Sequence, residues 1–230
     1  MPESNIHNLF PTPLWVVDFE EEVFVPVNQE IETGLETLIE QRPNVPPGGT
    51  LQTDTDLYEF EEFAGIMALI GTSVKGALDF LGIEEPFKIT GCWANINPVG
   101  GVNTPHTHPN NYLSGVYYVR TNEGSDRIFF SDPRPQASVI SPSVKEDNVY
   151  TGNEASVEAK IGRLIMFPAW LTHGVPANQS GKDRISISFN IMFPSFGDRM
   201  SKPKWSPSLE LRRTLKKNKS ELFGGVDFLG

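Results

Sequence analysis

The sequence predicts a mainly β protein with flanking α-helices, in which N-terminal helices support a jelly-roll core. Two observations carry this prediction. Two helical patterns come first, and a region of about 100 residues, 87–193, then consists of short β-like runs separated by turn residues. Short strands with few helices between them favour an antiparallel sandwich or barrel over a βαβ repeat.

The length of 230 residues fits one domain with extensions, and 38% apolar residues argue against wholesale disorder. A single cysteine excludes a disulfide framework and a cysteine-rich zinc site, and it fits a reducing compartment. There is no run of 18 apolar residues, and Met1–Phe10 lacks a basic segment followed by an apolar one. We therefore expect no membrane span, no secretory signal and a cytoplasmic location.

Charge is distributed unevenly along the chain. The net charge of −10 disfavours binding to nucleic acid phosphates. Residues 1–62 hold 14 carboxylates against one basic residue, whereas 201–219 hold seven basic residues against one acid. A basic tail either binds a polyanion or is simply solvated. We expect three parts: an N-terminal extension with two helices that pack on the core (1–86), the β core (87–196) and a basic C-terminal tail (197–230) whose helical content is left open.

Two N-terminal helices are predicted. Asn28–Gln41 has an apolar stripe, and Asn28 is a candidate N-cap. Tyr58–Leu81 is the longest helical pattern, and Gly82 stands where a glycine would end it. Between them, Arg42–Thr50 has three prolines and two glycines and is predicted to be a loop. The predicted strands are Lys88–Ile96, Tyr112–Arg120, Arg127–Phe130, Ser156–Ala159, Arg163–Phe167 and Ile185–Phe193.

Three of the four histidines fall in the β region. His106 and His108 are two residues apart, so on an extended segment both imidazoles share a face. His173 follows the predicted strand Arg163–Phe167. Three converging imidazoles would form a metal site with open positions, suited to iron, zinc, copper or nickel. The alternative is that the His106–His108 pair lies in a turn and the histidines are structural.

The last predicted strand has two unlike faces. Arg184, Ser186 and Ser188 alternate with apolar residues. If the polar face is exposed, this is an ordinary amphipathic strand. If it faces the interior, Arg184 is a buried cation that needs an anionic partner. Asp183 has the opposite parity, so a ligand carboxylate bound by the guanidinium is the favoured partner.

These segments resemble a known family. The pair His106-Thr107-His108, the segment GRLIMFPAWLTHGV at 162–175 and the segment RISIS at 184–188 are similar to the Fe(II)- and 2-oxoglutarate-dependent oxygenases. The likeness is strongest to the prolyl-hydroxylase-like branch and its small oxygenases of bacteria and phages. It spans about Trp93–Phe193, with the entry segment Asn8–Trp15. The resemblance implies a double-stranded β-helix core of jelly-roll or cupin-like type.

The resemblance also implies roles for individual residues. Fe(II) would bind to His106, His108 and His173. The C5 carboxylate of the cosubstrate 2-oxoglutarate would bind to Arg184 with Ser186 or Ser188. Tyr118, the second aromatic residue in SGVYYV at 114–119, would hydrogen-bond the cosubstrate or else be a core aromatic. Asn95 and Asn97 are further candidates to line the pocket.

One position departs from the family pattern, which has a carboxylate where this sequence has His108. Three outcomes are open. His108 replaces the acid as a ligand, another acid such as Asp132 completes the site, or the site has lost oxygenase chemistry. Three neutral imidazoles would leave the full double charge on the metal.

The family implies an enzyme that uses O2 to hydroxylate a peptidyl residue, with proline as the first example, or a small metabolite. Two other classes remain: a three-histidine cupin-type metal dioxygenase that does not use 2-oxoglutarate, and a jelly-roll binding module without catalysis. No membrane partner is expected. The oligomeric state is open, a homodimer included. The loops Arg42–Thr50 and Arg134–Tyr150 are expected to cover the mouth of the site or to be surface.

Overall fold

The computed structural model describes residues 3–40, 46–134, 136, 139–140, 142–146 and 148–196. The predicted loops at 42–50 and 134–150 are therefore described in part, and the predicted basic tail at 197–230 lies outside the described residues. The chain divides into two compact units, 1–192 and 193–230, and only residues 193–196 of the second are described. The helices and strands given below all belong to the first unit.

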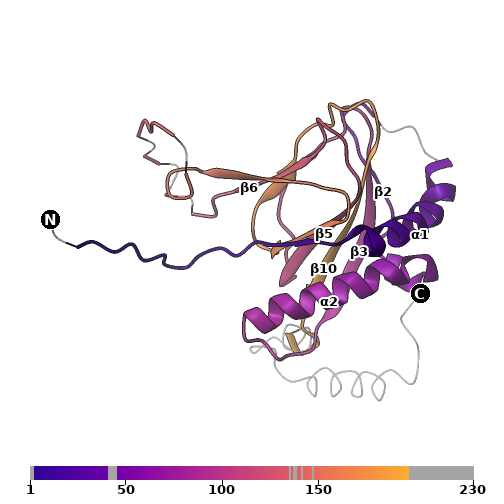
Figure 1. The fold of residues 1–230 in the computed structure, drawn as a ribbon, viewed down its shortest axis with the longest axis horizontal. Coiled ribbons are helices and arrows are strands. Elements are labelled where there is room, and N and C mark those ends of the chain that lie inside the picture. The colour runs from indigo at the N-terminus through magenta and orange to yellow at the C-terminus, as the bar shows by residue number, and fades with distance from the viewer. Residues whose placement is uncertain are drawn as a thin grey trace, which may run out of the picture. The chain divides into compact units, whose positions relative to one another are not determined.

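Two antiparallel sheets form the core of the described chain, as the sequence predicts. The larger sheet has the strand order β1-β8-β5-β10-β3-β2, and the smaller has the order β4-β9-β6-β7. The strands are β1 (Trp15–Asp18), β2 (Leu51–Gln52), β3 (Lys88–Asn97), β4 (Asn103–His106), β5 (Leu113–Arg120), β6 (Arg127–Ser131), β7 (Glu154–Glu158), β8 (Arg163–Pro168), β9 (His173–Val175) and β10 (Arg184–Met192). Figure 1 shows how β2, β3, β5 and β10 run together while β6 lies to one side.

All six predicted strands are confirmed, with bounds that differ by one or two residues. Four further strands, β1, β2, β4 and β9, were not predicted. Each has only two to four residues and depends on pairing with a neighbouring strand more than on its own sequence. β4 also contains Pro105, which is tolerated because β4 lies at a sheet edge.

The first helix differs from its prediction. α1 spans Glu21–Glu40 and begins seven residues before Asn28, with Pro26 inside it. The N-cap assignment of Asn28 is therefore wrong. Instead Asn28 is buried, its side-chain NH2 donates to the carbonyl of Val119 at 3.1 Å, and its Oδ1 accepts from the Tyr117 hydroxyl at 2.7 Å. Asn28 therefore does not cap α1 but connects it to β5.

The second helical pattern is divided. It forms two 3₁₀ turns, η1 (Leu57–Glu59) and η2 (Glu61–Phe63), followed by α2 (Ala64–Phe80), because Phe60 is extended. The predicted end is confirmed. Gly82 has φ 69° and its N–H donates to Asp79 at 3.1 Å, while the N–H of Ile83 donates to Leu78 at 2.9 Å. These two bonds form a Schellman motif, which requires the left-handed conformation that glycine adopts readily.

The segment Glu61–Phe80 is long and apolar enough, by length and composition alone, to cross a membrane. The described contacts instead resemble those of a core helix. Six of its apolar side chains are buried: Phe63, Ile66, Ile70, Val74, Ala77 and Leu78. A Cβ added at Gly65 would approach Val27 and Glu30 of α1, so the two helices pack closely. That the chain spans no membrane stays a prediction.

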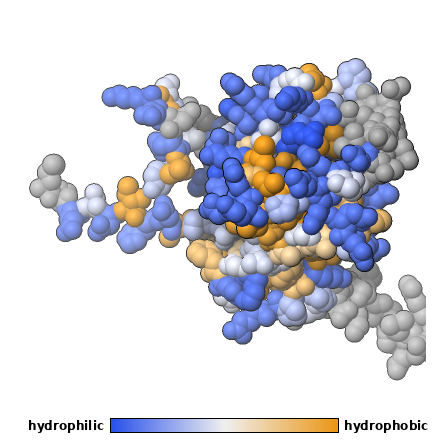
Figure 2. Space-filling model, turned by 45° about the vertical axis from the view of Figure 1, so that its right-hand side comes forward, coloured by the Kyte–Doolittle hydropathy of each residue, from blue (hydrophilic) through white to orange (hydrophobic). Residues whose placement is uncertain are grey.

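The two faces of the large sheet pack against different partners. Residues of β5 alternate, so Tyr117 points toward α1 while Val116 and Tyr118 point toward the smaller sheet. Figure 1 shows α1 and α2 together beside the large sheet. The apolar cluster between the sheets consists of Val116, Tyr118, Ile128, Phe130, Ala159, Ile165, Phe167 and Leu171. On the face shown in Figure 2, hydrophilic residues surround a limited area of hydrophobic ones.

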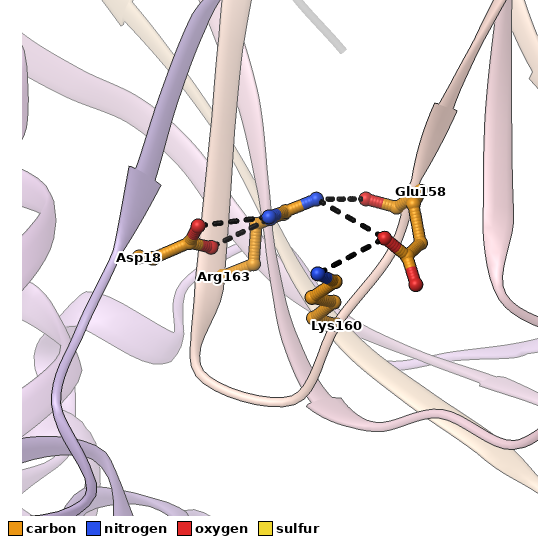
Figure 3. Close-up of polar contacts among 4 residues, drawn as sticks. All are labelled: Asp18, Glu158, Lys160 and Arg163. Carbon is orange, nitrogen blue, oxygen red and sulfur yellow. Dashed lines mark hydrogen bonds and ion pairs between the residues drawn. The ribbon is translucent and has the colours of Figure 1, made fainter.

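An ion-pair cluster links β1, the edge strand of the large sheet, to β8 and to the end of β7 (Figure 3). The Arg163 guanidinium donates to both carboxylate oxygens of Asp18, at 2.6 and 2.8 Å, and to the carbonyl of Glu158 at 2.8 Å. Lys160 pairs with the Glu158 carboxylate at 3.1 Å. The guanidinium holds the pKa of Asp18 below its ordinary value. The cluster therefore joins residues 145 positions apart.

Candidate metal centre

The three histidines converge at one end of the smaller sheet. His106 ends β4 and His173 begins β9, and the two residues face each other in the register of that strand pair. His108 follows β4, where its backbone N–H donates to the carbonyl of Ala169 at 2.9 Å. The candidate ligand atoms of the three side chains all lie within 4.8 Å of one another. Nitrogens bound to one ion at about 2.1 Å from it lie about 3–4 Å apart, so small ring rotations would close the group around an ion.

Backbone carbonyls fix the ring orientation of two of these histidines. The Nδ1 atom of His106 lies 2.7 Å from the carbonyl oxygen of Thr104, and that of His173 lies 2.9 Å from the carbonyl oxygen of Leu171. Because a carbonyl oxygen can only accept, Nδ1 is the protonated nitrogen in both rings, and Nε2 carries the lone pair. This arrangement is typical of metal-ligating histidines, whose second nitrogen is held by an outer hydrogen bond.

Burial keeps two of the imidazoles neutral. His173 is 5% exposed, and the ring of Phe167 lies 4.4 Å from its own. Burial lowers the pKa of His173 to about 4. The hydrogen bond to the Leu171 backbone raises this pKa in part, and the other two histidines lower it further. Burial, and then the charge of His106, lowers the pKa of His108 to about 4. At neutral pH both rings are therefore in the form that binds a metal.

The alternative ligand Asp132 is not part of this cluster. The group of candidate ligands in the described chain contains the three histidines and no carboxylate. Asp132 is instead paired with Arg134, whose Nε and NH2 groups donate to its two oxygens at 3.0 and 2.7 Å. This guanidinium lowers the pKa of Asp132. Of the three outcomes left open by the sequence, the geometry favours His108 in place of the family's acid.

The predicted cosubstrate residues line the same pocket as the histidines. Arg184, Ser186 and Ser188 share the face of β10 that turns inward, and Tyr118 lies opposite Ser186 on β5. The remaining lining residues come from both sheets: Gln52, Trp93, Asn95, Asn103, Gly115, Val116, Ile128, Phe167 and Val175. No aspartate or glutamate is among the described residues that line it. The pocket thus combines three imidazoles and one cation with neutral walls.

Two buried polar atoms of the pocket have no hydrogen-bond partner among the described residues: Nε of Arg184 and the hydroxyl of Tyr118. Arg184 is only 2% exposed. Burial lowers its pKa, although a guanidinium stays protonated in proteins, and burial raises the pKa of Tyr118 to about 12. Unpartnered buried donors are unfavourable, typically by about 1–3 kcal/mol each. A carboxylate accepts hydrogen bonds from both kinds of donor, so these residues suit the far end of 2-oxoglutarate.

The other candidates are placed as follows. Ser188 accepts a hydrogen bond from the side chain of Asn95 at 2.9 Å, and both residues line the pocket. Asn97 is fully buried behind Arg184 and contacts it, while Arg184 itself lines the pocket. Sequence reasoning missed Gln52 and Asn103, because both lie on the short strands β2 and β4 that the sequence pattern does not reveal.

Comparisons with known proteins agree with this geometry. Residues 91–190, a stretch of 100 of the 230 residues, match the family model described as "Putative 2OG-Fe(II) oxygenase". No curated protein matches the sequence.

Several solved structures share the fold. HygX from Streptomyces hygroscopicus, crystallised with nickel and 2-oxoglutarate, is 16% identical over 80% of this chain and 84% of its own, with a TM-score of 0.56. A Pseudomonas putida prolyl-4-hydroxylase is 13% identical over 79% of this chain and 93% of its own, with a TM-score of 0.56. A Trichoplax adhaerens prolyl hydroxylase, in complex with a hypoxia-inducible-factor peptide fragment, is 13% identical over 83% and 87%, with a TM-score of 0.54.

These structures confirm the predicted double-stranded β-helix, and the family model indicates the chemistry of the proteins to which this β core is similar. The oxygenases of this family use Fe(II) and 2-oxoglutarate, and three imidazoles and an unpaired buried guanidinium suit the binding of both. Residues 91–190 therefore have a double-stranded β-helix fold and match the family model of the 2-oxoglutarate- and Fe(II)-dependent oxygenases.

Proposed function

We propose that this oxygenase binds Fe(II) through His106, His108 and His173 and hydroxylates a peptidyl residue such as proline, or a small metabolite. One observation supports an anionic cosubstrate in the pocket. A guanidinium that is 2% exposed keeps its Nε without a partner in the described structure, inside the pocket that the three imidazoles line. An anionic ligand would pair with this charge and supply the acceptor that Nε lacks.

The chain's own residues have distinct tasks in this function. His106 and His173 present Nε2 because backbone carbonyls hold their Nδ1–H groups. Arg184 binds the C5 carboxylate of 2-oxoglutarate, and the Tyr118 hydroxyl donates to the same ligand. Phe167 and Ile128 close the inner side of the pocket and exclude water from it. None of these residues needs to transfer a proton for the reaction.

When bound, Fe(II) and 2-oxoglutarate supply the oxidising chemistry: O2 is reduced as 2-oxoglutarate loses CO2 and becomes succinate, and one oxygen atom enters the substrate as a hydroxyl group. The protein contributes positioning and exclusion of water. His106 is exposed whereas His173 is buried, so the substrate has access from the side of β4. A peptide is supported as the substrate by the shared fold of the two prolyl hydroxylases.

An anaerobic titration tests the proposal. Protein loaded with Fe(II) is mixed with 2-oxoglutarate without O2, and we expect the weak visible charge-transfer band of the chelate to appear and saturate at one equivalent. With O2 added, each 2-oxoglutarate consumed should yield one succinate. A band that fails to form although iron is bound would favour the cupin-type dioxygenase, and failure to bind iron at all would favour the binding module.

The substrate class needs a separate experiment. Proline-containing peptides and free amino acids are incubated with the loaded enzyme, and the mass gain of one oxygen atom is followed by mass spectrometry. Substrate-dependent succinate formation with a peptide pool, absent with free amino acids, is the outcome expected for a peptidyl hydroxylase. The opposite result would identify a small-metabolite hydroxylase.

A further inference from the structure

Two asparagine side chains hold the Nη2 group of Arg184, while its Nε has no partner among the described residues. Its NH2 group donates to Oδ1 of Asn97 at 2.8 Å and lies 3.4 Å from Oδ1 of Asn103. Asn97 lies on β3, directly opposite Arg184 in the register of β3 and β10, and Asn103 begins β4. The guanidinium is therefore fixed between the large sheet and the strand that carries His106.

A hydrogen-bond network fixes the orientation of these amides. The Nδ2 group of Asn97 donates to the hydroxyl of Thr50 at 2.7 Å and to Oδ1 of Asn103 at 2.9 Å. Because both donor positions of Asn97 are used in this way, its oxygen must face Arg184. The backbone carbonyl of Asn97 also accepts from Asn178 at 2.9 Å. Asn97 is fully buried, so no water competes for these bonds.

The amides satisfy the guanidinium without neutralising it. An amide oxygen accepts a hydrogen bond but has no net charge, whereas an aspartate at the same place would form a buried ion pair. No carboxylate is among the groups that perturb the pKa of Arg184, which burial lowers and only Tyr118 raises. The full positive charge of Arg184 therefore remains available to a ligand on the pocket side.

We propose that Asn97 and Asn103 are positioning residues that set cosubstrate specificity: they orient Arg184 and leave its charge unpaired, so that the site selects a 2-oxo acid with a second carboxylate. This inference rests on the proposed function of the same pocket and extends it to two residues that the cosubstrate does not need to touch.

The test measures two ligands that differ in the second carboxylate. The full chain is loaded with Ni(II), and the binding of 2-oxoglutarate and of 2-oxobutyrate is measured by isothermal titration calorimetry. The variants are Asn97→Asp and Asn103→Asp, each of which places a carboxylate next to Arg184. Asn103→Asp keeps the Oδ1 acceptor used by Asn97 and Arg184, so it remains informative if Asn97→Asp does not fold.

The matched control is Asn190→Asp. Asn190 is a buried asparagine on the same face of β10 and accepts from Ser114 at 2.7 Å. It lies six residues from Arg184, roughly 20 Å along the strand, so its charge should not reach the guanidinium strongly.

We expect Asn97→Asp to weaken 2-oxoglutarate binding by about 10- to 100-fold and 2-oxobutyrate binding by less than about 3-fold. Asn103→Asp should act in the same direction with a smaller effect, because its oxygen lies farther from the guanidinium. Asn190→Asp should leave the ratio of the two affinities unchanged. A merely structural role would weaken both ligands equally and leave that ratio unaltered.

The two proposals fail differently. If the unmodified protein binds Ni(II) and prefers 2-oxoglutarate, but both aspartate variants keep that preference, the role of the asparagines is refuted while the proposed function stands. If the unmodified protein shows no preference for the second carboxylate, the assignment of Arg184 to the cosubstrate is itself wrong, and the inference falls with it.

Discussion

Two neighbouring tyrosines show how differently the two faces of the large sheet are built. Tyr117 and Tyr118 are consecutive on β5, both are almost completely buried, and burial raises the pKa of each. The Tyr117 hydroxyl points toward α1 and donates to Asn28 at 2.7 Å. The Tyr118 hydroxyl points into the pocket and has no partner among the described residues.

This difference between the two hydroxyls indicates that the helix face serves stability and the pocket face serves binding. On the helix side the Tyr117 hydroxyl has a partner, because Asn28 accepts from it and also donates to the carbonyl of Val119. On the pocket side, two buried donors are left unpaired, on Tyr118 and Arg184. Unpaired buried donors destabilise a fold, so they persist where a ligand completes them. The following predictions test this contrast, starting with the largest effect.

Removing one imidazole from the pocket should have the largest effect, which is a loss of metal binding. We expect His173→Ala to weaken Fe(II) or Ni(II) binding by at least about 100-fold, since two ligands remain. Bound metal is measured by elemental analysis after dialysis. His7→Ala is the matched control, because His7 is exposed and far from β4 and β9 in sequence. Equal metal content in the two variants would contradict the assignment of the site.

Removing the guanidinium should affect the cosubstrate and spare the metal. Arg184→Ala should weaken 2-oxoglutarate binding by about 10- to 150-fold, the effect of losing a charged hydrogen bond. Metal content should stay the same, because Arg184 is not among the clustered histidines. Arg184→Lys should rescue binding only in part, since an ammonium lacks the planar fork. Unchanged 2-oxoglutarate affinity in Arg184→Ala would defeat the assignment.

The two tyrosines should respond oppositely to loss of their hydroxyls. Tyr117→Phe should lower the free energy of unfolding by about 1–3 kcal/mol, because it leaves Oδ1 of Asn28 buried and unpaired. Tyr118→Phe should change it by less than about 0.5 kcal/mol but weaken 2-oxoglutarate binding by about 3- to 10-fold. Urea denaturation and calorimetry measure the two effects. If both variants lost stability equally, the contrast between the faces would be wrong.

The smallest effect is expected at the sheet edge, away from both tyrosines. Asp18→Asn should lower stability at pH 7 by about 0.5 kcal/mol, because the Asp18 side chain is 60% exposed and its pair with Arg163 is partly screened. Since the folded state lowers the pKa of Asp18 from 3.8, this stabilisation is complete above about pH 5 and declines as the pH falls through and below 3.8. Urea denaturation at pH 7 and at about pH 3 should show that the difference in free energy of unfolding between the unmodified protein and Asp18→Asn is smaller at the lower pH. A difference that grew at low pH would contradict the pair.

The longer strands could be predicted from the sequence alone. β3, β5 and β10 have eight to ten residues each, and runs of β-forming residues bounded by turn residues identified all three. The strands that carry His106 and His173 have four and three residues, so their existence depends on pairing with each other and not on local pattern. Asn28 was misassigned for a related reason: its partners lie 89 and 91 residues away.

By itself, the sequence determined which side chains were available and which of them shared a face. The period of two in a strand puts Arg184, Ser186 and Ser188 on one side wherever that strand lies. Only the tertiary structure decided that this side turns inward, that His173 meets His106 and His108, and that amides from β3 and β4 surround the guanidinium. Those outcomes depend on contacts between residues more than 60 positions apart, and no local pattern encodes the pairing that creates them.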